Sequence, residues 1–286
     1  DVEESGLVWE VADADCWTYP IPGSLTLQPW RSTPTGQLQV SMHPTQGLPA
    51  APADPRHVLI RAIDRLKADG YHPVMAVELE FYLLDKNRDA NGRPQPALQA
   101  NGVRPQAPQV YGVYEHGTPL LKHAIGGMMA TLNDALAIFC PNANSYRRFQ
   151  ANSYAPLAKS WGVNNRTVSF RVPGGPAKSR HVEHRICGAD ANPYLAAAAI
   201  LSGIHHGIKN QIDPGEEIIG NGYEQARETL PTDWLTALRA LENSAWAKDA
   251  LGEEFLKVFL AIKWNEFRQF MGEVGEQDWR WYLTHA

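Results

Sequence analysis

Charged residues are concentrated on the short strand-like runs between residues 141 and 199, where a buried strand would carry mostly valine and isoleucine. Because side chains alternate between the two faces of a strand, His181, Glu183 and Arg185 should share one face. Acids and arginines on one face are costly to enclose unless they are paired or bind something. The stretch therefore predicts a sheet with a charged face, and that face is the expected site of chemistry.

A second strand is predicted at residues 74–85, with Glu78 and Glu80 on the face opposite its apolar side chains. The rise along a strand separates these two carboxylates by about 7 Å. If that face is enclosed, the two charges repel each other unless a cation lies between them. Carboxylate oxygens are preferred ligands of Mg²⁺ and Mn²⁺, so the pair indicates a divalent metal site. The alternative is a surface strand whose acidic face is simply solvated.

Arginines accompany these acids along the sequence: Arg148, Arg166, Arg171 and Arg185. A guanidinium group binds carboxylate or phosphate through two parallel hydrogen bonds. Any one of these arginines taken alone is explained equally well by a surface ion pair of little energetic value. As a group near a metal-binding cluster, they indicate an anionic substrate together with a nucleotide phosphate.

These residues lie in a series of short motifs, which are ADPRHVL, ELEFYLLD, NSYRRF, Ala155-Pro156, NNRT, SFRVPGG, EHR and ANPYLAAAA. The series resembles the glutamine synthetase superfamily, and within it the γ-glutamylpolyamine synthetase branch, from about Asp15 to the C-terminus. The resemblance implies an α+β fold, with a curved antiparallel sheet and helices in the catalytic domain. It also implies ATP-dependent ligation, in which the γ-carboxylate of L-glutamate is phosphorylated and an amine then displaces the phosphate.

The resemblance assigns metal and substrate roles to particular positions. It implies that Glu78 and Glu183 bind the metal ion that bridges the ATP phosphates. Glu80 matches a ligand of a second metal ion beside glutamate, so two Mg²⁺ or Mn²⁺ ions are expected. It further implies that Arg148 and Arg185 hold the carboxylates of the substrate.

Catalytic and ATP-binding roles follow from the same resemblance. Arg166 and Arg171 match arginines that face the phosphoryl group during transfer, where positioning and charge neutralisation supply most of the catalysis. Both would also contact ATP, as would Lys178, whose loop is one residue shorter than the family pattern. Tyr154 is the third residue expected to act in catalysis.

Tyr154 departs from the family in a way that bears on the substrate. Ammonia-using glutamine synthetases have a glutamate immediately before the Ala-Pro pair, where its charge attracts ammonium. A phenol, whose usual pKa is about 10, offers no anion at neutral pH, but it can contact a larger amine. A polyamine or an arylalkylamine is therefore the predicted nucleophile. The alternatives are an ammonia-dependent glutamine synthetase, with its acid supplied elsewhere, and a catalytically inactive regulatory or structural relative.

The family pattern also has a long middle section, with two further metal glutamates and a metal-binding histidine, that this chain lacks. The sequence passes over it near residues 114–115. We expect a mobile segment at this point rather than a natural deletion. The predicted domains are residues 1–50, as the C-terminal part of a β-grasp domain, and residues 51–286, as the catalytic domain.

Composition restricts the partners and the compartment. The formal net charge of −5 argues against nucleic-acid binding and against binding to anionic membranes. Three cysteines, Cys16, Cys140 and Cys187, without metal-binding spacing indicate a reducing cytoplasm. No apolar run approaches the ~20 residues of a membrane-spanning helix. The resemblance implies a homo-oligomeric ring, a hexamer or a dodecamer, with active sites between subunits.

Helices are predicted where capping residues precede apolar periodicity. Asp54 and Asn192, each followed by proline, should cap helices at their N-termini. The Gly126-Gly127 pair should permit close packing of its helix. Aromatic residues in the last segment indicate either an oligomer contact or, as the better interpretation, a core-covering face. The predicted helical segments are residues 55–69, 120–139, 193–208 and 234–283.

Overall fold

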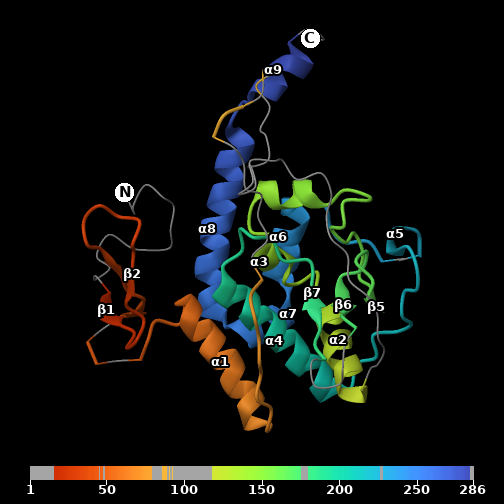
Figure 1. Ribbon diagram of the computed structural model, residues 1–286, viewed down its shortest axis with the longest axis horizontal. Coiled ribbons are helices and arrows are strands. Elements are labelled where there is room, and N and C mark those ends of the chain that lie inside the picture. The colour runs from red at the N-terminus through yellow and green to blue at the C-terminus, as the bar shows by residue number, and fades with distance from the viewer. Residues whose placement is uncertain are drawn as a thin grey trace.

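The computed structural model describes residues 16–44, 46–47, 49–78, 86–88, 90, 92, 118–174, 180–225 and 228–283. Helices are the main regular structure of the described chain, and a small sheet lies beside them (Figure 1). The N-terminal strands stand apart from this body and join it through the first helix (Figure 1). The arrangement confirms the predicted α+β class.

The N-terminal strands form two short antiparallel ribbons. β1 (Trp17–Pro20) pairs with β4 (Val40–His43), and β2 (Thr26–Leu27) pairs with β3 (Gly36–Gln37). Most of their apolar side chains are exposed, including Trp30. The ribbons therefore contribute little to the hydrophobic core. The predicted division of the chain after residue 50 stays a prediction.

Helix α1 (Pro55–Ala68) begins as its capping residue predicts. The Asp54 carboxylate accepts hydrogen bonds from the backbone N–H groups of Arg56 and His57, at 2.9 and 3.4 Å. Its other oxygen accepts from the N–H of Met42 at 2.9 Å. One buried carboxylate thus fixes the helix start and ties β4 to it. The helix start follows from an aspartate placed before proline, whereas the bond to β4 is a tertiary contact.

Helix α4 (Pro193–Asn210) crosses the centre of the body and packs on α1 and α2. Asn192 caps it by accepting from the N–H groups of Tyr194 and Leu195. Close contact with α2 depends on glycine, because a Cβ atom added at Gly127 would overlap the carbonyl oxygen of Gly203. The predicted role of the glycine pair in close packing is confirmed.

The predicted helix at residues 120–139 is wrong as a single element. The structure has α2 (Pro119–Thr131) and α3 (Leu136–Phe139), separated by a turn at residues 132–135. Asn133 and Asp134 are poor helix formers, and the Asp134 carboxylate accepts a hydrogen bond from the hydroxyl of Ser244 at 2.7 Å. This tertiary contact favours the break.

Three strands form the sheet beside these helices, in the order β5 (Trp161–Val163), β6 (Phe170–Val172), β7 (Glu183–His184). β6 and β7 are antiparallel, as predicted, but β5 and β6 are parallel. The parallel pair arises because residues 164–169 return the chain to the start of β5 rather than reversing it. Residues 74–78, the described part of the other predicted strand, belong to no strand.

The remaining elements are η1 (Ala143–Arg148), α5 (Gly222–Gln225), α6 (Trp234–Asn243), α7 (Ala245–Leu251), α8 (Glu253–Gly272) and α9 (Glu276–Tyr282). Helix α6 and the first half of α8 bury their apolar faces in the core, as preferred from the sequence. By contrast, α9 extends beyond the body, and its aromatic residues are exposed (Figure 1). Within the described residues, no helix has the length and apolarity needed to cross a membrane.

Candidate active site

The centre of the charged face is an ion pair between Arg171 on β6 and Glu183 on β7. The antiparallel register places these two residues directly opposite each other. Arg171 Nη1 donates to both carboxylate oxygens of Glu183, at 2.8 and 3.1 Å. The side chains are only 14% and 26% exposed, so water screens this pair less than a surface pair. The positive charge of Arg171 and the negative charge of Glu183 balance each other, which lowers the cost of partly burying both groups.

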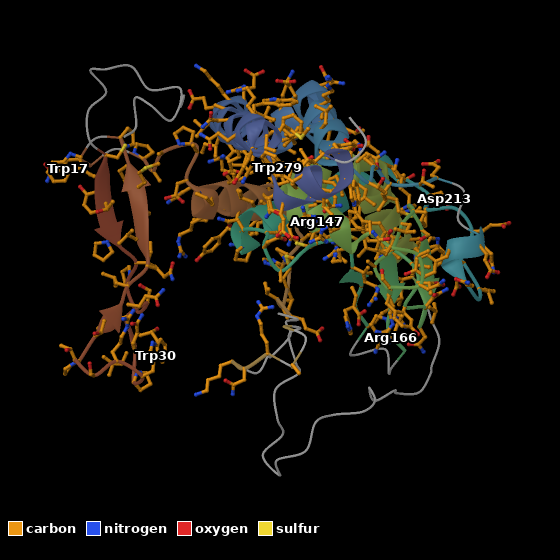
Figure 2. All side chains as sticks on the ribbon, turned by 90° about the horizontal axis from the view of Figure 1, so that it is seen from above. Trp17, Trp30, Arg147, Arg166, Asp213 and Trp279 are labelled. Carbon is orange, nitrogen blue, oxygen red and sulfur yellow. The ribbon has the colours of Figure 1, made fainter. Side chains whose placement is uncertain are left out.

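Arg185 extends this pair towards two loops. Its Nη1 lies 3.5 Å from Glu183 Oε2, on the same strand face, as the alternation of side chains predicted. Its Nη2 donates to the backbone carbonyls of Tyr154 and Arg166, each at 3.1 Å. The Tyr154 and Arg166 side chains themselves are exposed, and Figure 2 shows Arg166 beyond the ends of β5 and β6. Through Arg185, the Arg171–Glu183 pair is therefore connected to the loops that carry Tyr154 and Arg166, which are two further predicted site residues.

Arg148 uses its guanidinium group differently. It donates to the backbone carbonyls of Cys187, at 2.9 Å, and Ile186, and it lies over the Phe149 ring. These bonds fix the chain that follows β7. The structure therefore brings together Arg171, Glu183 and Arg185, and it holds Arg148 against the backbone beyond them.

The predicted metal ligands are described only in part. Glu78 is exposed at the end of a segment without regular structure. Glu80 and Lys178 lie outside the described residues, as does the predicted break at 114–115. The described chain contains no group of three or more acidic, histidine or cysteine side chains that could hold a metal ion. Glu78 and Glu183 nevertheless offer the hard oxygen donors that Mg²⁺ and Mn²⁺ prefer.

His184 occupies the opposite face of β7, as the alternation predicted; the residue is half-buried, and both of its ring nitrogens are shielded from water. Its ring lies 4.4 Å from the Phe139 ring and 5.2 Å from the Phe170 ring, measured between centroids. Neither ring nitrogen has a hydrogen-bond partner among the described residues. Burial lowers the pKa of His184 to about 3, so the ring is neutral and anchors the strand beneath Glu183.

No role was expected for Asn164, which follows β5. Its Oδ1 accepts a hydrogen bond from Gly174 N at 2.7 Å and from Arg171 Nη2 at 3.4 Å. Its backbone has a positive φ of 51°. Asparagine tolerates this conformation better than most residues, which is the only signal that the sequence offered.

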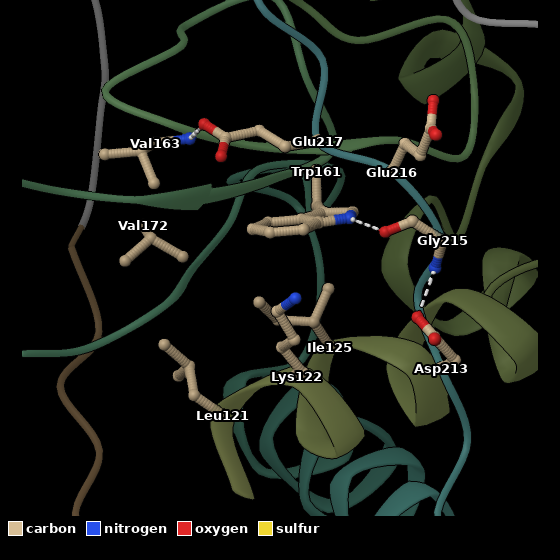
Figure 3. A pocket seen from close by; sticks show the side chains of 10 residues that line it. All are labelled: Leu121, Lys122, Ile125, Trp161, Val163, Val172, Asp213, Gly215, Glu216 and Glu217. Atoms are coloured by element: carbon tan, nitrogen blue, oxygen red, sulfur yellow. Dashed lines mark hydrogen bonds between the residues drawn. The ribbon is translucent and has the colours of Figure 1, made fainter. Parts of the chain in front are cut away.

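An open pocket of about 530 Å³ lies beside the site (Figure 3). Trp161, Ile125 and Val172 form its apolar floor, while Lys122 and an acidic loop at residues 213–217 form its walls (Figure 3). Val172 and Arg171 are neighbours on one strand, so they point to opposite faces of the sheet. The pocket therefore lies behind the charged face and not on it.

The described site is a helix-backed sheet whose face carries a partly buried carboxylate between two arginines. Known proteins with this architecture include GmaS, of which a ligand-free structure superposes with a TM-score of 0.71 and 21% identity. The superposition covers 98% of this chain and 88% of GmaS, and it shows the fold.

Sequence comparison identifies the family. The family model "Glutamine synthetase, catalytic domain" matches residues 52–118 and 112–282. Gamma-glutamylputrescine synthetase PuuA of Escherichia coli (strain K12) is 31% identical over 390 aligned positions, covering 100% of this chain and 82% of the relative. Glutamate–isopropylamine ligase of a Pseudomonas species is 36% identical over 163 residues, which cover 56% of this chain and 35% of the relative. The chain belongs to the glutamine synthetase family.

Proposed function

We propose that the chain ligates the γ-carboxylate of L-glutamate to an amine, with hydrolysis of ATP to ADP and phosphate. The observation that carries the proposal is the Arg171–Glu183–Arg185 cluster, which combines anion-binding and metal-binding groups on one sheet face. Relatives support the choice of an amine, because PuuA and the Pseudomonas enzyme are named as ligases of putrescine and isopropylamine. A γ-glutamylethanolamide synthetase of Streptomyces coelicolor, 38% identical over 56% of this chain and 34% of its own length, agrees.

The reaction has two steps. A γ-carboxylate oxygen of glutamate attacks the terminal phosphorus of ATP, and ADP leaves. The amine nitrogen then attacks the acyl carbon of γ-glutamyl phosphate, the C–O bond breaks, and phosphate leaves while the nitrogen loses a proton. The product is a γ-glutamyl amide.

Charge neutralisation is the main task of the protein in both steps. We assign Arg166 and Arg171 to the phosphoryl oxygens and to ATP. Arg171 is already held at Glu183, and Arg166 is exposed at the loop tip. Arg148 and Arg185 are assigned to the carboxylates of glutamate, and Lys178 to the nucleotide.

Divalent cations complete the proposed site. Glu78, Glu80 and Glu183 would hold two Mg²⁺ or Mn²⁺ ions, which neutralise phosphate charge when bound. The donor chemistry of Glu78 and Glu183 fits this role. In the family pattern, further metal ligands lie in a middle section that does not appear in this sequence. Two findings support its location near residues 114–115. The family match falls into two segments that meet at 112–118, and the PuuA alignment is longer than this chain.

Tyr154 is assigned to the amine. Its side chain is 62% exposed, and its backbone has a φ of 61°, a conformation that is unusual for a bulky residue. Such strain is typical of functional loops. An aromatic ring at the edge of the site attracts an alkylammonium ion through apolar and cation–π contact. This supports an amine substrate over ammonia.

Assembly and location are part of the proposal. A homo-oligomeric ring, hexamer or dodecamer, is inferred from the family resemblance. A cytoplasmic location is supported by three free cysteines. Burial raises the pKa of the Cys140 thiol to about 12 and that of Cys187 to about 11, so both remain protonated and unreactive at neutral pH.

An amine panel tests the substrate assignment. Each reaction would contain ATP, glutamate, Mg²⁺ and one nucleophile: putrescine, ethanolamine, isopropylamine or ammonium. Phosphate release would be measured, and the products would be identified by mass spectrometry. We expect γ-glutamyl amides with at least one amine at a higher kcat/KM than ammonium. Tyr154→Glu should shift the preference towards ammonium, whereas Tyr282→Glu, at an equally exposed tyrosine on α9, should not. Turnover with ammonium alone contradicts the amine assignment, and no turnover at all favours the inactive relative.

A further inference from the structure

We propose that Asn164 is a positioning residue for this ligation, which fixes the direction of Arg171. The inference rests on the proposed function, because it concerns the reaction in which Arg171 takes part. No role was expected for Asn164 from the sequence. Its contacts give it one.

Asn164 connects three parts of the site through one side chain and its backbone. Its N–H donates to the carbonyl of Val172 at 3.0 Å, which holds the residue beside the end of β6. Its Oδ1 accepts from Gly174 N at 2.7 Å and from Arg171 Nη2 at 3.4 Å. Gly174 lies two residues beyond the end of β6. The amide oxygen therefore links the guanidinium group to the backbone just beyond that strand.

Arg171 is held at two of its nitrogens. Nη1 is bonded to both oxygens of Glu183, and Nη2 is bonded to Asn164. A planar guanidinium group held only at Nη1 can rotate about that contact. A second contact at Nη2 fixes its plane, and binding of carboxylate or phosphate depends on that plane. Misplacement of a catalytic group by about 1 Å can reduce the rate by about 10²-fold.

The amide group of Asn164 shows that its oxygen is the functional end. Both neighbours, Gly174 N and Arg171 Nη2, are donors, so only the oxygen can face them. The amide nitrogen is left buried without a partner among the described residues. Leaving a buried donor unsatisfied is costly, and native proteins rarely retain one without a use. The use here is a neutral acceptor that orients Arg171 without cancelling its charge.

The test compares glycine and aspartate at this position. Asn164→Gly keeps the positive φ but removes the acceptor, so we expect kcat to fall about 10- to 100-fold, with KM for the amine changed by less than about threefold. Asn164→Asp keeps an acceptor for both donors but adds a negative charge beside Arg171, so it should recover only part of that loss. Gln211→Gly is the matched control, because Gln211 also has a φ of 51° but ends α4 outside the site. It should keep wild-type kcat.

A double-mutant cycle separates positioning from a general structural role. If Asn164 acts through Arg171, Asn164→Gly should cause no further loss of kcat in an Arg171→Lys background. An equal loss in both backgrounds, or a wild-type kcat for Asn164→Gly, overturns the inference. If the wild-type chain makes no product with any amine, the proposed function fails instead. In that case, hydrogen exchange at the Gly174 amide tests the contacts of Asn164 without any activity. Asn164→Gly should accelerate this exchange, and Gln211→Gly should not. Unchanged exchange refutes the role of Asn164.

Discussion

His184 should make the catalytic sheet sensitive to acid. Its neutral ring is enclosed between Phe139 and Phe170, and burial lowers its pKa from 6.5 to about 3. In the unfolded chain the ring takes up a proton as the pH falls below 6.5, whereas in the folded protein it remains neutral down to about pH 3. The free energy of unfolding is therefore unaffected by His184 above pH 6.5 and decreases as the pH falls towards 3.

The magnitude follows from the width of this window. Each pH unit below 6.5 removes about 1.4 kcal/mol of stability through one such group. Lowering the pH from 7.5 to 5 crosses one and a half units of the window, so His184 alone should cost about 2 kcal/mol. Carboxylates elsewhere in the protein add their own pH dependence. The loss of stability between the two pH values, compared between wild type and a variant without His184, isolates the contribution of His184.

Urea denaturation at pH 7.5 and pH 5, at one fixed protein concentration, measures this contribution. His184→Leu removes the titrating group and two unsatisfied nitrogens from an apolar site, so its loss of stability between the two pH values should be about 2 kcal/mol smaller than that of wild type. His72→Gln, at an exposed position, should lose as much as wild type. Equal losses for wild type and His184→Leu would show that the ring is not buried in the neutral form.

Two further predictions concern the framework that carries the site. Gly127→Ala should lower the free energy of unfolding by about 1–3 kcal/mol, because the added methyl group overlaps α4, as thermal or urea unfolding would show. Gly272→Ala, at the end of α8 where an added Cβ has no neighbour within 4 Å, should be neutral or stabilising; a loss as large as that of Gly127→Ala would refute the packing argument. Asp54→Ala should destabilise the protein by about 1–2 kcal/mol, since it removes the cap of α1 and the bond to β4. Asp233→Ala, which removes one backbone bond from the start of α6, should cost less in the same assay, and the reverse order would contradict this explanation.

Local signals predicted local structure. Asp54 and Asn192 each precede proline and apolar periodicity, and both cap helices as expected. The break between α2 and α3 was missed because it depends on a bond from Ser244, more than a hundred residues away. Apolar periodicity alone cannot reveal such a contact.

The sequence predicted which types of residue form the site, but not which of these residues contact each other. Alternation along the strand placed Glu183 and Arg185 on one face and His184 on the other, and the structure agrees. The pairing of Arg171 with Glu183 depends on strand register, which the sequence does not reveal. Asn164 was missed for a related reason, because its function depends on which donors its amide oxygen meets.

Transfer of oxygen from glutamate to phosphate is the most direct test of the proposed chemistry. The enzyme would be given ATP, an accepted amine and glutamate labelled with ¹⁸O in its γ-carboxylate, and the released phosphate analysed by mass spectrometry. Formation of γ-glutamyl phosphate predicts that each phosphate released with product carries one labelled oxygen. Product formation with unlabelled phosphate would contradict the acyl phosphate route and the charged face proposed to support it.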